Sequence, residues 1–536
     1  MRRFFGIFIF IVLGFLLGFG VREVQGEIRA KREAKERKFS YATAPVLEEK
    51  AFVVLIFEEE GRSEETLLTA LNQEYDAYRV IYFGSENSAA KLFLKNYDLE
   101  GKVTYVESHK EKSELVYRAV HAAESKEIVV MLGGGDSFSS RQVLSTLNKH
   151  FADSDVWMLS SQTLHYPTYE KTWNPGYFQA FYAGLAKQIR LETFLMDGAF
   201  TREHYEKVLF PRLSSVAGSH AYQMKEPLFI SGASRALPLM DEEGTYAPAK
   251  EYPWHDISKD EERVDLLVFS YNRPLQLYAF LESSEKYLEN LHRMFVIYRA
   301  GNDHYEKGYK KVKEAFPNVI YMKQSVDHPS EDFAPTVQKA LFDRDISSAR
   351  FVTFAFDDFV LKEEIDLQEA ACLLKETGAY GFYFCLGNNL QNHPQEEKKI
   401  LIQEGIYGWQ FSTMEGAWRV PNSVRMTLFK KEEIAGDFLY MKYHNPNLLE
   451  ALWSEKADLS RIGLYYDRSK ALSLPLNLTV EGEGIEEKVS KMSTKELLTL
   501  FDQGLKMDIT SIQKVDNRAI DLSIKPTFIQ RQGDRK

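Results

Sequence analysis

Short apolar runs alternate with stretches of helical periodicity, and this alternation occurs twice along the 536 residues of the chain. Apolar runs of this length between helices are typical of strands in a parallel α/β sheet, because helices cover both faces of such a sheet. The expected strands of the first half are residues 51–57, 78–83, 102–106 and 127–132. Those of the second half are a strand followed by a turn over 262–274, then 294–301, 318–324 and a strand that runs into the acid pair within 351–360. We therefore predict an α/β protein with two tandem, mostly parallel sheets.

Changes in composition between and beyond these alternations indicate the domain boundaries. Residues 241–261, DEEGTYAPAKEYPWHDISKDE, are polar, contain two prolines and suit a linker. Ser493 and Glu496 have the spacing of a capping box at the start of a helix in the tail. The predicted division is a membrane anchor or signal segment at 1–26, a charged stalk at 27–50, α/β domains at 51–245 and 262–484, and a helical and extended tail at 485–536.

The N-terminal segment indicates how the chain would lie relative to a membrane. Residues 4–21 are 18 residues without a charge; as a helix they would span about 27 Å, close to a hydrocarbon core of about 30 Å. A cleaved signal peptide is the alternative, because residues 24–26 offer a cleavage site. Seven basic residues follow the run and two precede it, which favours a single-pass anchor with the bulk of the chain in the cytoplasm. Cleavage would instead make the protein secreted or lumenal.

Overall charge and cysteine content narrow the class of protein. The formal charge is −11 and the sequence pI is about 5.7, which disfavours a general nucleic-acid binder because such proteins neutralise phosphates with basic surface. The two cysteines, Cys372 and Cys385, are too few for a disulfide framework and fit a reducing compartment. Asn477 begins a glycosylation sequon, which matters only in a lumenal chain.

Two of the expected strands run into turns of the same outline. VVMLGGGDSF at 129–138 places one carboxylate, Asp136, after three glycines, whereas FVTFAFDDFV at 351–360 keeps two, Asp357 and Asp358. Ligands of open α/β sheets bind beyond the carboxyl ends of the strands. Adjacent carboxylates there suit a hard divalent cation that bridges diphosphate oxygens. The alternative is that the acid pair only caps the turn that follows.

The order of these motifs resembles that of family-2-like glycosyltransferases with the GT-A fold. In the second half, a YNRP turn after the first strand precedes the diacidic turn and a region rich in Trp and Glu. In the first half, TLLTALNQEYDAYRVIYFGSEN is similar to the helix and second strand of that fold, and VVMLGGGDSFSSRQVLSTLNKHFADSDVW to its DxD turn and following helix. The resemblance covers most of 51–245 and 262–480 and implies two tandem GT-A-like domains.

The first half departs from the family pattern at its site. Gly133 and Gly135 stand where the DxD turn would have acids, which leaves Asp136 alone. A serine, Ser214 or Ser215, lies where the family has its catalytic acid. The glycines are also not followed by Lys and Ser/Thr at P-loop spacing. The resemblance therefore implies a degenerate first domain, a scaffold or acceptor-binding unit; a modified but working donor site is the alternative.

The second half retains the residues that the resemblance links to donor binding. Arg299 stands at a second-strand position where an acid is usual, and its guanidinium would contact the diphosphate instead. Asp358 matches the DxD position and is the expected ligand of Mn²⁺ or Mg²⁺. The residues implied in cofactor binding are Ser270, Asn272, Arg273, Arg299 and Asp357.

The region downstream offers catalytic candidates. An inverting transferase needs a carboxylate that takes the proton of the acceptor hydroxyl, and Glu450 is the first candidate for this base and Glu415 the second. His444 is a candidate third metal ligand. Trp409 and Trp418 would either stack on sugar rings or belong to the core. For Glu450 the alternative is a solvated helix face, because NPNLLEALW is amphipathic.

These expectations combine into one function and two alternatives. We expect a membrane-anchored, metal-dependent glycosyltransferase that moves a sugar from a nucleotide-sugar donor to a glycan or lipid acceptor, with no nucleic-acid partner. One alternative is a non-catalytic carbohydrate-binding or assembly protein in which both sites have decayed. The other is a nucleotidyltransferase, which uses a similar sheet and metal but has no need of an anchor.

Overall fold

The fold is described by a computed structural model. It covers residues 48–58, 63–98, 101–133, 135–172, 179–202, 205–231, 249, 262–325, 327–477 and 492–531. The expected anchor, nearly all of the expected stalk and most of the expected linker lie outside these residues, as do Leu478 and Thr479 of the sequon. Across the described ranges, no helix combines the length and the apolar character needed to cross a membrane.

The first sheet has the strand order β3-β2-β1-β4-β8-β6-β11-β5, with β7 paired to β6. Its first four strands in this order are parallel, and β8 is antiparallel to β4. The strands are β1 (Phe52–Phe57), β2 (Tyr78–Gly84), β3 (Val103–Glu107), β4 (Ile128–Gly133), β5 (Ser137–Phe138), β6 (Met158–His165), β7 (Glu170–Thr172), β8 (Gln179–Tyr182) and β11 (Ala221–Ser231). The accompanying α-helices are α2 (Ser63–Leu71), α3 (Ala89–Tyr97), α4 (Lys112–Ala122), α5 (Val143–Phe151), α6 (Ala183–Ala186) and α7 (Tyr205–Ala217).

The second sheet has the strand order β15-β14-β12-β16-β22-β19-β23-β21-β20. Again the first four are parallel and the next, β22, is antiparallel. The strands are β12 (Val264–Tyr271), β14 (Leu291–Arg299), β15 (Ile320–Lys323), β16 (Phe351–Phe356), β19 (Gly381–Tyr383), β20 (Ile400–Gln403), β21 (Ile406–Gln410), β22 (Thr427–Lys430) and β23 (Ile462–Tyr466). The α-helices are α8 (Pro274–Tyr287), α9 (Asp303–Ala315), α10 (Pro329–Phe342), α11 (Leu367–Thr377), α12 (Lys431–Tyr440) and α13 (Pro446–Ser454).

The two sheets share one topology at their parallel edge. In chain order the four parallel strands are arranged 3-2-1-4 in both, so β4 of the first sheet corresponds to β16 of the second. The predicted α/β class with two sheets is confirmed, but the sheets are mixed: among the described strands, antiparallel pairings are as frequent in each sheet as parallel ones. Helix α8 ends at Tyr287, because Leu288 and Glu289 form a strand, β13, that pairs with β18 (Ile365–Asp366).

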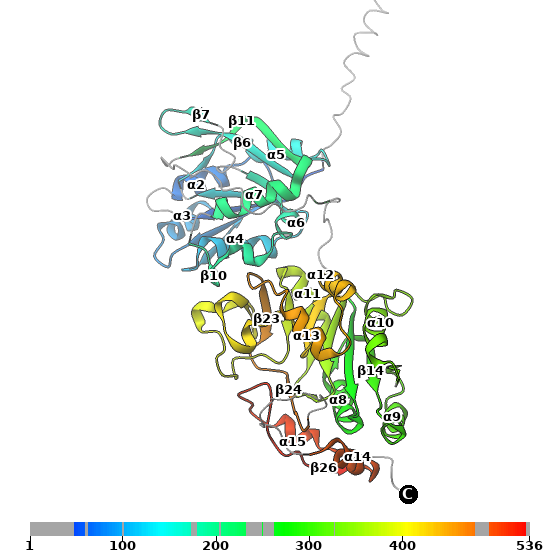
Figure 1. The fold of residues 1–536 in the computed structure, drawn as a ribbon. Coiled ribbons are helices and arrows are strands. Elements are labelled where there is room, and N and C mark those ends of the chain that lie inside the picture. The colour runs from blue at the N-terminus through cyan, green and yellow to red at the C-terminus, as the bar shows by residue number, and fades with distance from the viewer. Residues whose placement is uncertain are drawn as a thin grey trace, which may run out of the picture.

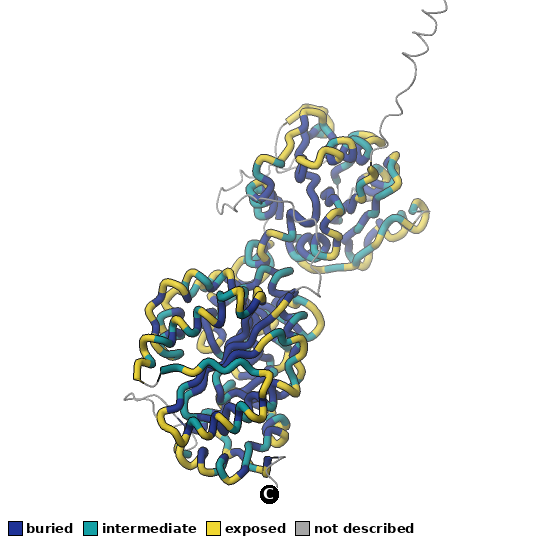
Figure 2. The backbone as a smooth tube through the Cα atoms, turned by 90° about the vertical axis from the view of Figure 1, so that its right-hand side faces the viewer, coloured by how far each residue is buried: buried dark blue, intermediate teal, exposed yellow. Residues whose placement is uncertain are grey.

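The central strands of the second sheet are buried on both faces (Figure 2). Val264, Leu266 and Val268 of β12 belong to one apolar cluster, and Leu267 and Phe269 belong to another on the opposite face. Adjacent strand residues point to opposite faces, so the unbroken apolar run predicted here is what a sheet covered on both sides requires. The covered strands fix the position of the polar residues that follow them.

The C-terminal segment packs on the second sheet's part of the molecule (Figure 1). The predicted capping box of Ser493 and Glu496 is present and opens α14 (Thr494–Asp502), which contacts α8 and α9. Beyond α15 (Ile509–Gln513), the backbone of Ile520 and Leu522 bonds to Ser473 of β24 (Ala471–Ser473), with N···O distances of 2.9 Å each. The segment after α15 therefore reaches back towards the strands that carry the acid pair.

The two sheet-bearing parts meet in polar contacts. Arg461 Nε lies 2.7 Å from Glu192 Oε1, and Arg461 Nη2 lies 2.9 Å from Glu433 Oε2. His121 Nε2 lies 3.0 Å from the carbonyl oxygen of Glu376. Thus Arg461 of the second part lies between one carboxylate of each part.

Candidate functional site

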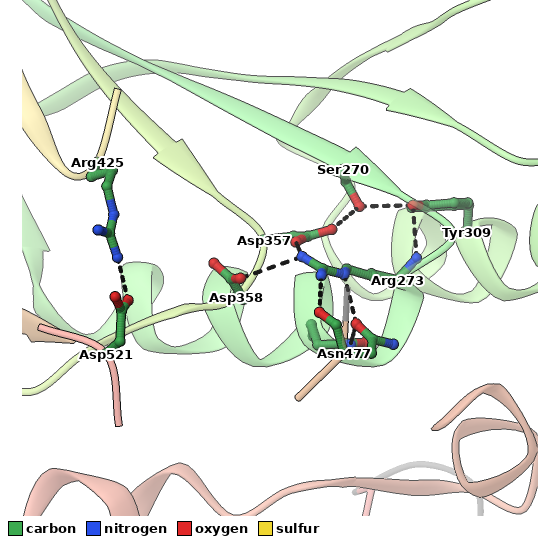
Figure 3. Close-up of polar contacts among 9 residues, drawn as sticks. Ser270, Arg273, Tyr309, Asp357, Asp358, Arg425, Asn477 and Asp521 are labelled. Carbon is green, nitrogen blue, oxygen red and sulfur yellow. Dashed lines mark hydrogen bonds and ion pairs between the residues drawn. The ribbon is translucent and has the colours of Figure 1, made fainter. Parts of the chain in front are cut away.

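Polar residues gather at the carboxyl ends of β12, β14 and β16 (Figure 3). Because the strand order is β14-β12-β16, the chain leaves β12 in one direction along the sheet for β14 and arrives at β16 on the other side. A switch point of this kind is where open α/β sheets bind ligands. Ser270 is the next-to-last residue of β12, Arg273 follows that strand, and Asp357 follows β16, so the structure brings these three predicted residues together at the switch point.

Arg273 holds the acid pair together. Its Nη1 lies 3.1 Å from Asp357 Oδ1 and 3.3 Å from Asp358 Oδ2. Its Nε donates to Asn477 Oδ1 at 2.9 Å, and its Nη2 donates to the Asn477 carbonyl oxygen. Arg273 is buried, so its guanidinium is held in place by the two acids on one side and by Asn477 on the other.

A chain of hydroxyl groups fixes Asp357 from its other oxygen. Ser270 Oγ donates to Asp357 Oδ2 at 2.7 Å and lies 2.7 Å from the hydroxyl of Tyr309 in α9. That hydroxyl also accepts a bond from the backbone N–H of Arg273 at 3.2 Å. Both oxygens of Asp357 are therefore engaged within the protein, which makes this residue a support for the site.

Burial sets the protonation of the two acids. It raises the pKa of Asp357 to about 6, although the Arg273 guanidinium acts in the opposite direction. It also raises the pKa of Asp358, against the lowering effects of Arg273 and Arg425. Asp357 is thus ionised at pH 7 and takes up a proton as the pH falls through about 6. Asp358 keeps 15% of its side chain exposed, and Arg273 engages its Oδ2.

Asn272 and Arg299 shape the neighbouring turn. Asn272 has a positive φ of 55°, and its Oδ1 accepts from the backbone N–H of Gly301 at 2.7 Å. Its own N–H donates to the carbonyl oxygen of Arg299 at 3.2 Å. The Arg299 guanidinium lies 4.1 Å from the ring centroid of Tyr271, within the range of a cation–π contact. Asn272 therefore supports the backbone of the turn, while Arg299 lies beside it.

Glu450 lines a cavity of about 410 Å³ whose lining also includes Arg425, the residue whose guanidinium charge acts on Asp358 of the acid pair. It lies on α13, and its Oε1 accepts from Ser423 Oγ at 3.1 Å and from the backbone N–H of Val424 at 3.3 Å. Both of these bonds are made by Oε1. The cavity is lined by Tyr383, Cys385, Leu386, Ala417, Val420, Ser423, Arg425, Thr427, Asn447, Glu450, Ala451, Ser454 and Ile520.

A second cavity of about 240 Å³ adjoins the first, because Ala417, Arg425 and Ile520 line both. Glu415 lies here, exposed at the start of a 3₁₀ turn. Asp521 from the C-terminal segment also lines this cavity and forms an ion pair with Arg425. The two candidate bases, Glu450 and Glu415, therefore line different cavities.

The structure does not place His444 in a metal site with the acid pair. His444 is exposed between α12 and α13. Within the part of the chain that the structure describes, no three His, Cys, Asp or Glu side chains come together as a metal site would require. Asp357 is bonded on both of its oxygens, and His444 as a further ligand beside Asp358 stays a prediction from the sequence.

Trp409 belongs to the core and is not available for stacking on a sugar. Its side chain is fully buried, its Nε1 donates to the carbonyl oxygen of Trp418 at 2.7 Å, and the two indole centroids are 5.2 Å apart. Trp418 is also buried, although it lines the smaller cavity. The core alternative for Trp409 is the one that the structure supports.

Sequence reasoning missed Asn477, Arg425 and Asp521. In the sequence, Asn477 stands out only as the first residue of a glycosylation sequon. In the structure its buried side chain accepts a hydrogen bond from Arg273 Nε. Arg425 and Asp521 are 96 residues apart in sequence, and neither lies in a motif. The nearest sequence signal for Arg425 is the apolar pattern of residues 427–430, which predicts a strand. That pattern does not indicate a role for Arg425, which lies two residues before it.

Replacing Asn477 tests its role in holding Arg273. Asn477→Ala leaves the buried Nε of Arg273 without its acceptor, so we expect the free energy of unfolding to fall by about 1–3 kcal/mol. Asn477→Asp keeps an acceptor oxygen beside the guanidinium and should retain most of the stability. Urea denaturation followed by circular dichroism measures both; an equal loss in the two variants would mean that the side chain acts through packing alone.

In the first sheet, the turn that follows β4 uses its acid for a hydrogen bond within the turn. Asp136 is buried after β4, and its Oδ2 accepts from the backbone N–H of Gly133 at 3.2 Å. Glu58, which follows β1, accepts from the backbone N–H of Ser85 at 2.7 Å. The one acid of VVMLGGGDSF therefore bonds to the backbone of its own turn.

Comparisons with known proteins complete this description. No family model matches the chain. A segment of 139 residues is 27% identical to the bifunctional glycosyltransferase pgtA of Dictyostelium discoideum, covering 24% of this chain and 17% of that protein. The match thus spans about a sixth of the length of this relative.

Solved structures give more distant matches. The mannosyltransferase PcManGT from Pyrobaculum calidifontis, in complex with GDP-Man and Mn²⁺, is 16% identical over 35% of this chain and 59% of its own, with a TM-score of 0.27. Glucosyl-3-phosphoglycerate synthase from Mycobacterium tuberculosis, in complex with Mn²⁺, UDP-glucose and phosphoglyceric acid, is 13% identical over 35% of this chain and 73% of its own, also with a TM-score of 0.27. The sequence match to a bifunctional glycosyltransferase agrees with the resemblance of the sequence motifs.

Proposed function

We propose that the chain is a metal-dependent glycosyltransferase whose site lies at the carboxyl edge of the second sheet. The observation that carries the proposal is the acid pair at the switch point, with Asp358 partly exposed beside a cavity that holds the carboxylate of Glu450. The sequence similarity to a bifunctional glycosyltransferase supports the same class of reaction. The donor would be a nucleotide-sugar, and the acceptor a glycan or lipid.

The residues present fit a divalent cation that is completed by the donor. Mg²⁺-type sites often take one or two carboxylates together with substrate phosphates, and Asp358 Oδ1 offers one such ligand. The four acids Asp357, Asp358, Glu450 and Asp521 outnumber the two guanidinium groups of Arg273 and Arg425, so a diphosphate needs added positive charge there. When bound, the ion stabilises the charge that develops on the leaving diphosphate.

Glu450 would act on the acceptor. Its Oε1 is held by Ser423 and by the backbone of Val424, so the carboxylate is oriented before a substrate arrives. Oε2 then takes the proton of an acceptor hydroxyl as that oxygen attacks the sugar carbon and the bond to the diphosphate breaks. The larger cavity, with apolar and polar residues in its lining, would receive the acceptor.

Replacing Glu450 separates catalysis from donor binding. Glu450→Gln keeps the bonds made by Oε1 but removes the base, so we expect turnover to fall by about a hundredfold or more while donor affinity stays unchanged. The measurement is release of UDP or GDP from UDP- and GDP-sugars with Mn²⁺. Glu455→Gln, an exposed residue at the end of the same helix, is the matched control. Equal turnover in all three proteins would contradict the role of Glu450.

The remaining parts of the chain complete the proposal. The domain boundaries at 51–245 and 262–484, a first domain that acts as scaffold or acceptor-binding unit, and an N-terminal single-pass anchor with the bulk in the cytoplasm stay predictions from the sequence. A sugar acceptor at the membrane would give such an anchor a purpose. Fractionation of cells that express the full chain, with and without residues 1–26, would test the anchor.

A further inference from the structure

Arg425 lies at the junction of the two cavities. It precedes β22, the antiparallel neighbour of β16, and it lines both the larger and the smaller cavity. Among the described residues that line the larger cavity, Arg425 alone is basic. Its guanidinium lies 5.8 Å from the ring centroid of Phe359, the residue that follows Asp358. A positive charge is thus placed where the acid pair and the cavity of Glu450 meet.

The partner of Arg425 comes from the C-terminal segment. Arg425 Nη2 forms an ion pair with Asp521 Oδ1, in which 32% of the Arg425 side chain and 52% of the Asp521 side chain remain exposed. In Figure 3 this pair lies on the side of Asp358 away from Arg273. An ion pair with this much exposure contributes little to stability, so it is easily exchanged for a stronger partner.

The two guanidinium groups of the site differ in what they can do. Arg273 is buried and bonds to Asp357, Asp358 and Asn477, so turning it towards a ligand would leave buried acids without their counter-charge. Arg425, on turning to a ligand, would lose only its ion pair with the partly exposed carboxylate of Asp521. Of the two, Arg425 is therefore the group that can accept a phosphate, which matches a guanidinium in geometry and carries more charge than a carboxylate.

Asp521 can release Arg425 without movement of its segment. The backbone on either side of it is fixed, because the carbonyl oxygen of Ile520 accepts from the N–H of Ser473 and the N–H of Leu522 donates to the carbonyl oxygen of Ser473, both at 2.9 Å. Rotation of the Asp521 side chain is then sufficient to free the guanidinium.

We propose that Arg425 binds the diphosphate of the nucleotide and that Asp521 occupies Arg425 until the diphosphate arrives. This inference rests on the proposed function, because the diphosphate is that of the donor or of the nucleoside diphosphate product. It adds a positioning residue for the leaving group and gives the C-terminal segment a part in the site: Asp521 competes with the ligand for one cation.

Calorimetric titration of the full chain with UDP and GDP, in the presence of Mn²⁺, tests the proposal. Arg425→Gln should weaken the binding of the nucleotide by about tenfold or more, the size of a charge-assisted hydrogen bond. Asp521→Asn should strengthen it by about two- to fivefold, because the competing carboxylate is lost. When Arg425→Gln is already present, adding Asp521→Asn should no longer strengthen the binding of the nucleotide. Arg518→Gln, which removes an exposed basic residue of the smaller cavity, is the control and should change affinity less than twofold.

The outcomes separate this inference from the proposed function. If the unchanged chain binds neither UDP nor GDP, the proposed function itself fails. If it binds one of them and both Arg425→Gln and Asp521→Asn leave the affinity unchanged, Arg425 has no part in phosphate binding. Should Arg425→Gln fail to fold, as judged by its thermal unfolding, Asp521→Asn alone decides: a gain in affinity supports the competition and no gain overturns it.

Discussion

Asp358→Asn should abolish metal-dependent nucleotide binding, whereas Asp136→Asn should leave it nearly unchanged. Asp358 has an oxygen that Arg273 does not engage and a partly exposed side chain, so it is the acid able to ligate a cation. Even the outer-shell partners of metal ligands are worth roughly 10–100-fold in affinity; loss of the ligand should therefore cost at least about a hundredfold. The measurement is the dissociation constant of UDP or GDP with Mn²⁺.

Asp136 is the matched comparison for this prediction. It lies after the topologically equivalent strand of the first sheet, and its carboxylate bonds to its own turn at Gly133. Both substitutions remove one negative charge and keep the side-chain shape. Equal losses in the two variants would contradict the assignment of the site to the second sheet.

Arg273→Met should lower the free energy of unfolding by about 3–5 kcal/mol, because removal of one partner leaves a buried charge uncompensated. Asp357 would lose the interaction that opposes the burial-driven rise of its pKa, and Asn477 would lose both of its bonds to the guanidinium. Guanidinium chloride denaturation, followed by circular dichroism, measures the change.

Arg344→Met is the control for this stability prediction. Arg344 is exposed on the loop after α10, and surface substitutions of this kind usually change stability by no more than about 0.5 kcal/mol. If Arg273→Met were as mild as Arg344→Met, the acid pair would not depend on the guanidinium, and its geometry would have to come from Ser270 and Tyr309.

The parts of the site that lie directly after strands could be predicted from the sequence. Ser270, Arg299 and Asp357 each stand at the end of an apolar run, and the order of parallel strands alone places such ends on one edge of a sheet. The fold class followed from the same apolar runs. Neither inference required knowledge of side-chain contacts.

The parts that depend on long-range packing could not be predicted. Asn477 reaches Arg273 across 204 residues, and Asp521 reaches Arg425 across 96; no local pattern encodes either meeting. The role of Trp409 could not be predicted either, because the sequence pattern of an aromatic residue in a short strand is the same whether its side chain faces a ligand or the core. Only the fold shows that it is enclosed by its aromatic neighbours.

The most direct test of a metal-dependent donor site is a calorimetric titration of the full chain with UDP- and GDP-sugars, first with Mn²⁺ and then with EDTA. We predict saturable binding of one of these donors in the presence of Mn²⁺ and its loss when EDTA is added. Absence of binding to every donor with Mn²⁺ present would contradict a transferase site and favour a non-catalytic carbohydrate-binding or assembly protein.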